Sequence, residues 1–304
     1  MTEDYSYFQD EQFRQSLAAY ERMQTTGEYV EFDSETLTDI AEYYAMEQRM
    51  DEADQCIHYA LSFYPDSVDP QIFLSRQQMF YDNEEEAWRL CRNICDQDDR
   101  EVLFLKVELY FYFNKSDKGY KLIMEAYNDC EDPMDAADLL YDAICLCRDY
   151  ELDDKALEWV MLLQRKHPDY TDADVLEAEV RNRLGHPEVS IQLLEKHLTE
   201  HPYDTHAWMQ LAEAHLTLNH YDEAAEAVDF VLAIDSEHAE ALILRGNILY
   251  DTEKPKEAHE YYTRFLGYFP NDERIRYLDA ECLMDMGQYE EAMRRLADGQ
   301  SRPS

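Results

Sequence analysis

The sequence predicts an all-α protein, built as a right-handed α-solenoid of about eight stacked helix-turn-helix repeats behind an N-terminal capping helix. Apolar residues recur with helical spacing almost throughout the chain. Gly and Pro are scarce, at 7 and 9 of 304 residues, which is too few for a chain rich in strands and tight turns. A small residue that follows an acidic turn also returns at nearly constant intervals, and such self-similarity is typical of repeat architectures.

The recurring small residue defines the repeat. It is Ala, Ser or Gly at all eight positions, namely Ala53, Ala87, Gly119, Ala156, Ser190, Ala224, Ala258 and Ala292. The gaps between them are 34, 32, 37, 34, 34, 34 and 34 residues. Twelve residues before each lies a second site, which is small in six of eight cases: Ala41, Ser75, Val107, Ile144, Ala178, Ala212, Gly246 and Ala280. Because two helices approach closely only where their side chains are small, the paired sites predict a tight antiparallel hairpin.

Start and stop signals surround each predicted hairpin. We expect Asp51 and Asp222 to cap the second helix of their hairpins, since Asp accepts hydrogen bonds from the first helical amides. Prolines close several units at Pro65, Pro168, Pro202 and Pro270, where a helix cannot continue. One helix of about 13 residues is marginal alone in water. Stacking of successive hairpins is therefore expected to bury the faces that one hairpin leaves open.

These sites resemble the pattern of the tetratricopeptide repeat family, here as an acidic, bacterial-type array. The best match comprises Trp208, Leu211, Ala212, His215, Ala224, Val228 and Val231. The resemblance implies repeats at 34–67, 68–99, 100–136, 137–170, 171–204, 205–238, 239–272 and 273–298. It also implies a lead-in and capping helix within residues 1–33, where Phe13, Leu17 and Tyr20 match helix-B sites, and a tail at 299–304.

The charge of the chain restricts its partners. Lys and Arg number 27 against 68 Asp and Glu, for a formal net charge of −41. Such a field repels nucleic-acid phosphates and anionic lipids, so we expect neither nucleic acid nor membrane as a partner.

The seven cysteines form no CxxC motif, and we interpret them as reduced thiols. With no signal peptide or transmembrane stretch, we expect a cytoplasmic location. The oligomeric state is left open.

No sequence motif points to catalysis. The chain has no Gly-rich phosphate loop, no HExxH and no GxSxG, so we expect neither an enzyme nor a cofactor. His197 and His201 are one helical turn apart, but a metal site needs three or four converging ligands. We therefore expect no metal, and read His197 and His215 as packing residues.

The family resemblance implies that the first helix of each repeat, helix A, lines an inner groove, and that the second is helix B. The ninth residues of the eight repeats, which lie on helix A, are Glu42, Arg76, Glu108, Cys145, Glu179, Glu213, Asn247 and Glu281. Five glutamates among eight would favour a cationic, extended ligand. The alternative is that the overall acidity alone places them there. The Lys and Asn pairs with which the family's best known groove grips an acidic chaperone tail are absent.

Large apolar residues occupy other inner positions of repeats two to four: Ile72, Met79, Phe80, Phe104, Phe111, Tyr112 and Tyr141. They either anchor a partner or pack against neighbouring helices, and the sequence leaves both open. We predict a non-catalytic scaffold whose groove binds a protein or peptide of basic character. The alternative is a regulatory or assembly module of a larger protein or enzyme complex, with the activity elsewhere. On the first reading, Phe104→Ala with Phe111→Ala weakens binding without unfolding the array.

Overall fold

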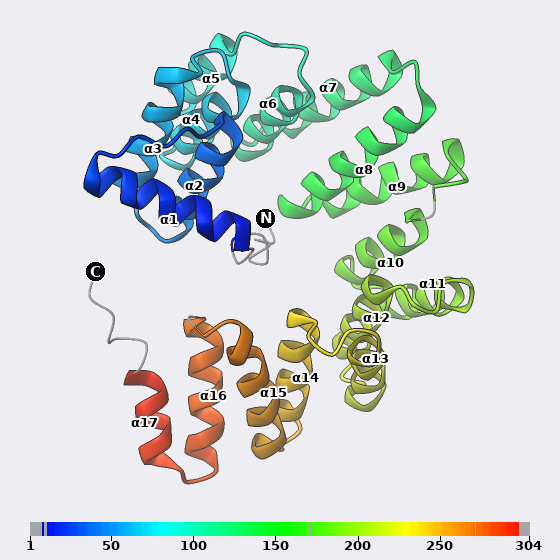
Figure 1. Cartoon of the computed structure of the whole chain (residues 1–304). Helices are drawn as coiled ribbons and strands as arrows, with labels where there is room; N and C mark the ends of the chain where they lie inside the picture. Colours follow the sequence, from blue (N-terminus) through cyan, green and yellow to red (C-terminus); the bar gives the residue numbers. More distant parts are fainter. Residues whose placement is uncertain (1–7, 9–10, 171, 271, 298–304) are drawn as a thin grey trace. The chain divides into compact units, whose positions relative to one another are not determined.

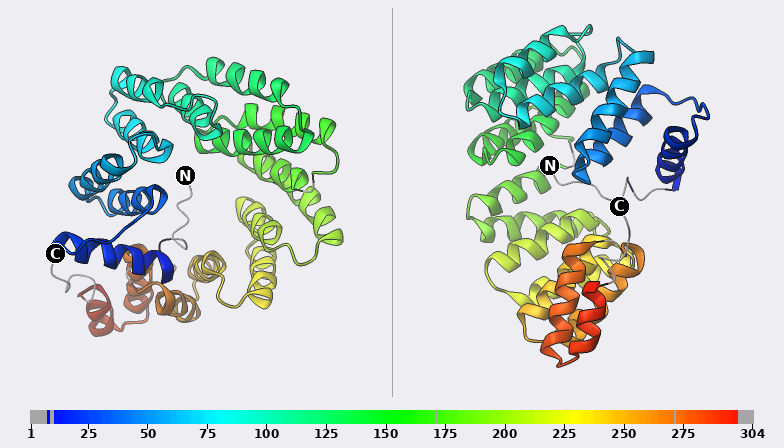
Figure 2. Two further views of the ribbon diagram at one scale, coloured as in Figure 1. Left: turned by 45° about the horizontal axis from the view of Figure 1, so that its top comes forward. Right: turned by 90° about the vertical axis from the view of Figure 1, so that its left-hand side faces the viewer.

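The computed structural model describes residues 8, 11–170, 172–270 and 272–297. The described residues form 17 α-helices and no strand (Figures 1 and 2). The predicted all-α helical-repeat class is therefore confirmed. The chain divides into two compact units, Met1–Leu152 and Asp153–Ser304. The predicted tail at 299–304 and the first seven residues lie outside the described part.

Unit 1 contains the predicted capping helix and the hairpins that follow it. Its helices are α1 (Glu11–Thr26), α2 (Ser34–Met46), α3 (Met50–Phe63), α4 (Val68–Phe80), α5 (Glu84–Asn93), α6 (Arg100–Tyr112), α7 (Ser116–Asp129) and α8 (Pro133–Asp149). Phe13 and Tyr20 of α1 are buried and join the core formed with α2 and α3. The fourth helix A, α8, begins four residues before the predicted repeat start at Ala137, because Asp132 caps it and Pro133 occupies its first turn.

Unit 2 contains the remaining helices. They are α9 (Asp153–Lys166), α10 (Ala173–Arg183), α11 (Pro187–Glu200), α12 (Thr205–Thr217), α13 (Tyr221–Ile234), α14 (Ala239–Asp251), α15 (Pro255–Tyr268), α16 (Glu273–Asp285) and α17 (Tyr289–Ala297). From α10 onward they pair as α10–α11, α12–α13, α14–α15 and α16–α17.

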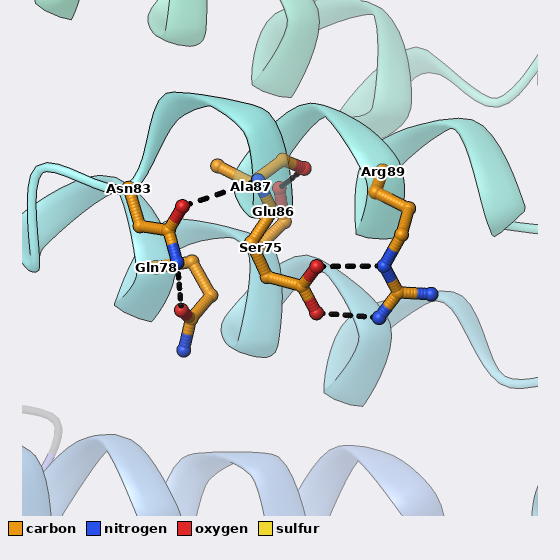
Figure 3. Close-up of polar contacts among 6 residues, drawn as sticks. All are labelled: Ser75, Gln78, Asn83, Glu86, Ala87 and Arg89. Atoms are coloured by element: carbon orange, nitrogen blue, oxygen red, sulfur yellow. Dashed lines mark hydrogen bonds and ion pairs between the residues drawn. The ribbon is translucent and has the colours of Figure 1, made fainter.

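The small sites lie where the sequence predicts them. All sixteen are buried. At Gly246 an added Cβ would come within 2.5 Å of the Tyr262 ring, and at Gly119 within 2.6 Å of the Phe111 ring. In the α4–α5 hairpin the small side chain also bonds across the crossing, since the Ser75 hydroxyl donates to the Ala87 carbonyl at 2.9 Å (Figure 3). Small residues therefore set the close approach of the paired helices.

One left-handed residue ends every helix A from α2 to α16. The positions with positive φ are Gln48, Asp82, Asn114, Glu151, Gly185, Asn219, Glu253 and Gly287. At the end of α2, the Arg49 amide donates to the Tyr44 carbonyl at 2.8 Å and the Gln48 amide to the Ala45 carbonyl at 3.0 Å. The same two bonds recur in all eight turns, and they define the Schellman motif. The main chain therefore closes the turn, even though only two of the eight residues are Gly.

The predicted capping by Asp51 and Asp222 is wrong. Both lie inside the first turn of α3 and α13, whose N-cap residues are Arg49 and His220, and no side chain caps either helix. Because helix B begins directly after the left-handed turn, both acids lie two residues after the N-cap position. Side-chain caps begin six of the A helices instead, at Asp33, Asp99, Asp132, Asp204, His238 and Asp272.

Candidate partner-binding surface

Three of the predicted groove residues belong to the core. Ile72, Met79 and Phe111 expose only 2%, 0% and 5% of their surfaces. The Phe111 ring packs edge-on against Tyr120 and Tyr150, with centroids 5.5 and 5.8 Å away. The sequence left open whether these residues anchor a partner or pack against neighbouring helices, and these three are packed inside the protein. Replacing Phe111 by Ala is expected to destabilise unit 1, so the Phe104 and Phe111 double variant does not isolate binding.

The remaining apolar residues of that set are accessible to different degrees. Phe80, at the end of α4, is 58% exposed. Its ring meets Tyr112 of α6 edge-on at 6.3 Å, while Tyr112, Phe104 and Tyr141 are half-buried. Of this set, Phe80 is thus the most accessible aromatic residue, and Tyr112 lies against it.

The ninth-position residues of α4 and α6 pair with each other. Arg76 Nε donates to Glu108 Oε2 at 2.8 Å. Glu108 is 8% exposed, and its other oxygen accepts from the Tyr150 hydroxyl at 3.5 Å. Glu108 is therefore engaged inside unit 1, contrary to a ladder of glutamates that all face a partner, and Arg76 acts as an internal counter-ion.

Carboxylates from three successive A helices lie close enough to interact with one another, and two of them, Glu42 and Glu101, also interact with this arginine. The helices α2, α4 and α6 pack in sequence, and they contribute Glu35 and Glu42, Asp69, and Glu101 respectively. We refer to Glu35, Glu42, Asp69 and Glu101 as the acidic face. Sequence reasoning missed three of its four members, although each occupies the second position of its repeat, a column that the repeat register makes readable.

Burial and mutual repulsion raise the pKa values of two members of this face, Glu42 and Glu101. Burial raises the pKa of Glu42 above its ordinary 4.5; the nearby Arg76 opposes the rise, while Asp39, Glu101 and Asp69 add to it. Burial likewise raises the pKa of Glu101, with Asp69 adding and Arg76 opposing. One arginine therefore does not neutralise these carboxylates, and an additional cation would stabilise their ionised forms.

The predicted glutamates of unit 2 lie on separate A helices. Glu179 on α10 and Glu281 on α16 are half-buried, and Glu213 on α12 is exposed. Tyr250 of α14 has a pKa raised by burial and by hydrogen bonding to Asp285. In this unit, Tyr250 therefore lies near acids of the next helix A, α16.

Two of the clustered histidines, His197 and His201, lie side by side. His197 is buried, its Nε2 lies 2.8 Å from Asp204 Oδ2, and its ring lies 4.7 Å from that of His201. A hollow of about 410 Å³ is lined by Asp172, His197, Glu200, His201, Pro202, Tyr203 and Asp204. In the described part of the chain, no three His, Cys, Asp or Glu side chains are arranged to hold a metal ion.

None of the described helices is long and apolar enough to cross a membrane.

Family models match the second half of the chain. Residues 227–298 match the model described as "Anaphase-promoting complex, cyclosome, subunit 3", and residues 182–248 match the model described as "Tetratricopeptide repeat". No curated protein matches the sequence.

Solved structures resemble parts of the chain. A crystal structure of MamA shares 17% identity over 51% of this chain and 90% of its own, with a TM-score of 0.46. MamA from Desulfovibrio magneticus RS-1, from residue 41 to its end, shares 15% identity over 54% and 93%, with a TM-score of 0.47. A thermophilic tetratricopeptide repeat protein of Thermus thermophilus, TTC0263, shares 18% identity over 55% and 90%, with a TM-score of 0.44.

Paired helices that cross at small residues, together with the matching models, define a helical-repeat protein. Within that class, the chain resembles tetratricopeptide repeat proteins, and the matching models cover residues 182–298. Proteins of this family generally serve as non-catalytic scaffolds for protein–protein interaction.

Proposed function

We propose that this protein is a non-catalytic scaffold that binds a basic, extended segment of a partner protein at the acidic face of α2, α4 and α6. The single observation that carries the proposal is the cluster of four interacting carboxylates, of which Glu42 and Glu101 lie near the one arginine, Arg76. Its free cysteines favour a reducing compartment, and we expect the protein to act in the cytoplasm.

The chemistry of the face favours a cation followed by an apolar group. A Lys or Arg placed among Glu42, Asp69 and Glu101 would relieve their mutual repulsion. The exposed Phe80 ring with Tyr112 would offer an apolar anchor at the C-terminal ends of α4 and α6. Aromatic anchors contribute much of the free energy at many interfaces, while charges at the rim mainly raise the association rate.

Binding of a short synthetic peptide tests the proposal. We expect a fluorescein-labelled peptide of alternating Lys and Phe to bind, a matched peptide of alternating Glu and Phe not to bind, and added salt to weaken the binding by screening. Fluorescence anisotropy with the full chain measures both. Glu42→Gln with Glu101→Gln should weaken binding about tenfold, whereas Glu131→Gln, in the exposed turn before α8, should not. Equal binding of both peptides, or equal effects of the two variants, would contradict the proposal.

Binding should also depend on pH with a definite sign. Glu42 and Glu101 have pKa values above the ordinary 4.5, so they are partly protonated at mildly acidic pH. A cationic peptide prefers their ionised forms, so affinity should rise as the pH is raised from below 4.5 through these pKa values, and should level off near neutrality. The Glu42→Gln, Glu101→Gln variant should show a flatter profile by the same anisotropy measurement.

A further inference from the structure

Each B helix presents one face to the next helix A. Asp54 of α3 accepts from Gln77 of α4 at 2.5 Å. Trp88 of α5 packs on Tyr110 of α6 with centroids 4.7 Å apart. One residue after the small site, seven successive positions are partly buried and none of them is exposed: Asp54, Trp88, Tyr120, Leu157, Ile191, Ala225 and His259. This column therefore marks the stacking face of a repeat.

The eighth member of that column is uncovered. Met293 of α17 is 68% exposed, and Tyr289, one turn before it, is 67% exposed. Leu296, which is partly buried against the core of the last hairpin, follows at the spacing that places all three on one helical stripe. On the adjoining helix α16, Tyr277 and Met284 are 61% and 40% exposed. We call these five residues the end face, and α17 lies beside α16 in Figure 1.

We infer that a second copy of this chain covers the end face, with the two α17 helices packed antiparallel about Met293. Contiguous exposed apolar residues commonly mark an interaction surface. Helix α17 carries two acids and two arginines, Glu290, Glu291, Arg294 and Arg295. It is electrically balanced within a chain of net charge −41, so two copies repel each other less at this helix than at an acidic surface.

The charge order along α17 suits a two-fold arrangement. Glu290 and Arg294 are four residues apart, so they lie on the same flank of the apolar stripe. In an antiparallel pair that crosses at Met293, Glu290 of each copy comes beside Arg294 of the other. The same patch then serves both partners, as a two-fold interface requires.

The contact should be reversible. Five apolar side chains per copy are far fewer than the about 20 residues per side of a standard interface. We therefore expect a dissociation constant in the micromolar range, with monomer and dimer both present in that range. Because this surface is not the acidic face, pairing does not require the proposed function.

Sedimentation velocity of the full chain at physiological ionic strength tests the pairing. Over a micromolar concentration series, we expect a monomer–dimer equilibrium that Met293→Glu weakens at least about tenfold. Met161→Glu, on the exposed surface of α9, should leave the equilibrium unchanged. Circular dichroism checks that both variants keep their helices. A monomer throughout the series, or a dimer that is indifferent to Met293→Glu, would overturn the inference.

Exchanging the charges tests the antiparallel register. Glu290→Arg alone and Arg294→Glu alone should each weaken dimerisation, because each brings like charges together across the two-fold axis. The double exchange should restore it. If a basic peptide binds at the acidic face while the chain stays monomeric, only the pairing fails. If the chain dimerises but no peptide binds, only the proposed function fails.

Discussion

The residue that ends each helix A adopts a backbone conformation that most side chains disfavour. Glu253 has φ of 60° and lies at the turn between α14 and α15. A left-handed conformation costs an ordinary L-residue about 1 kcal/mol or more, whereas Gly adopts it freely. Six of the eight turns bear this cost.

Replacing such a residue by Gly should therefore stabilise the protein. We expect Glu253→Gly to raise the free energy of unfolding by about 1 kcal/mol, measured as a higher urea midpoint. Glu260→Gly removes the same charge from an exposed position in the middle of α15 and should lower the stability by about 1 kcal/mol. If both variants lost stability, the turn would not be strained as described.

The close crossing of α14 and α15 can be tested in the same way. At Gly246 an added methyl would meet the Tyr262 ring at 2.5 Å, whereas at Gly267 nothing lies within 4 Å of that position. We expect Gly246→Ala to destabilise by about 2 kcal/mol through overpacking, and Gly267→Ala to be neutral or stabilising. Thermal unfolding followed by circular dichroism would distinguish them, and equal effects would argue against the crossing.

At the scale of elements, regular spacing carries most of the information. The small residues at 34-residue intervals placed both helices of each hairpin, because close crossings tolerate few side chains. The burial of Phe111 in the core was not predictable from its own position in the repeat. Its ring fills the space that Gly119 leaves on the facing helix, which depends on the three-dimensional pairing. The same holds for Glu108, whose neighbour Arg76 lies 32 residues earlier.

The last hairpin depends on a buried charge. Asp279 of α16 is fully buried; its Oδ1 lies 2.5 Å from His259 Nδ1 of α15, and its Oδ2 lies 2.7 Å from Arg295 Nε of α17. Removing one partner of a buried ion pair costs about 3 kcal/mol or more.

We therefore expect Arg295→Met to destabilise unit 2 by about 3 kcal/mol. Arg294, which is 69% exposed and pairs only with Glu291 of its own helix among the ion pairs described, offers a matched control. Arg294→Met should change the stability by less than about 0.5 kcal/mol. Urea unfolding at a concentration low enough to keep the chain monomeric measures both, and similar losses would contradict the role assigned to Asp279.

At the scale of the whole molecule, the net charge of −41 opposes compaction. Like charges held close in the folded chain repel each other more than in the unfolded chain, and salt screens this repulsion. We expect the melting temperature to rise with sodium chloride at neutral pH. A variant with the four acids of the acidic face replaced by their amides should melt higher at low salt and respond less. A melting temperature that fell with salt would show that attractive pairs dominate instead.

The main-chain closure of the eight turns has a consequence for how such a chain can change. The hydrogen bonds that shape each bend come from backbone amides and carbonyls, so they do not depend on the side chain at the left-handed position. Gln, Asp, Asn, Glu and Gly all occur there. A hairpin could therefore be copied, exchanged or inserted at these bends with little local adjustment. Lengthening or shortening the array by whole units should be easier than altering any single crossing within it.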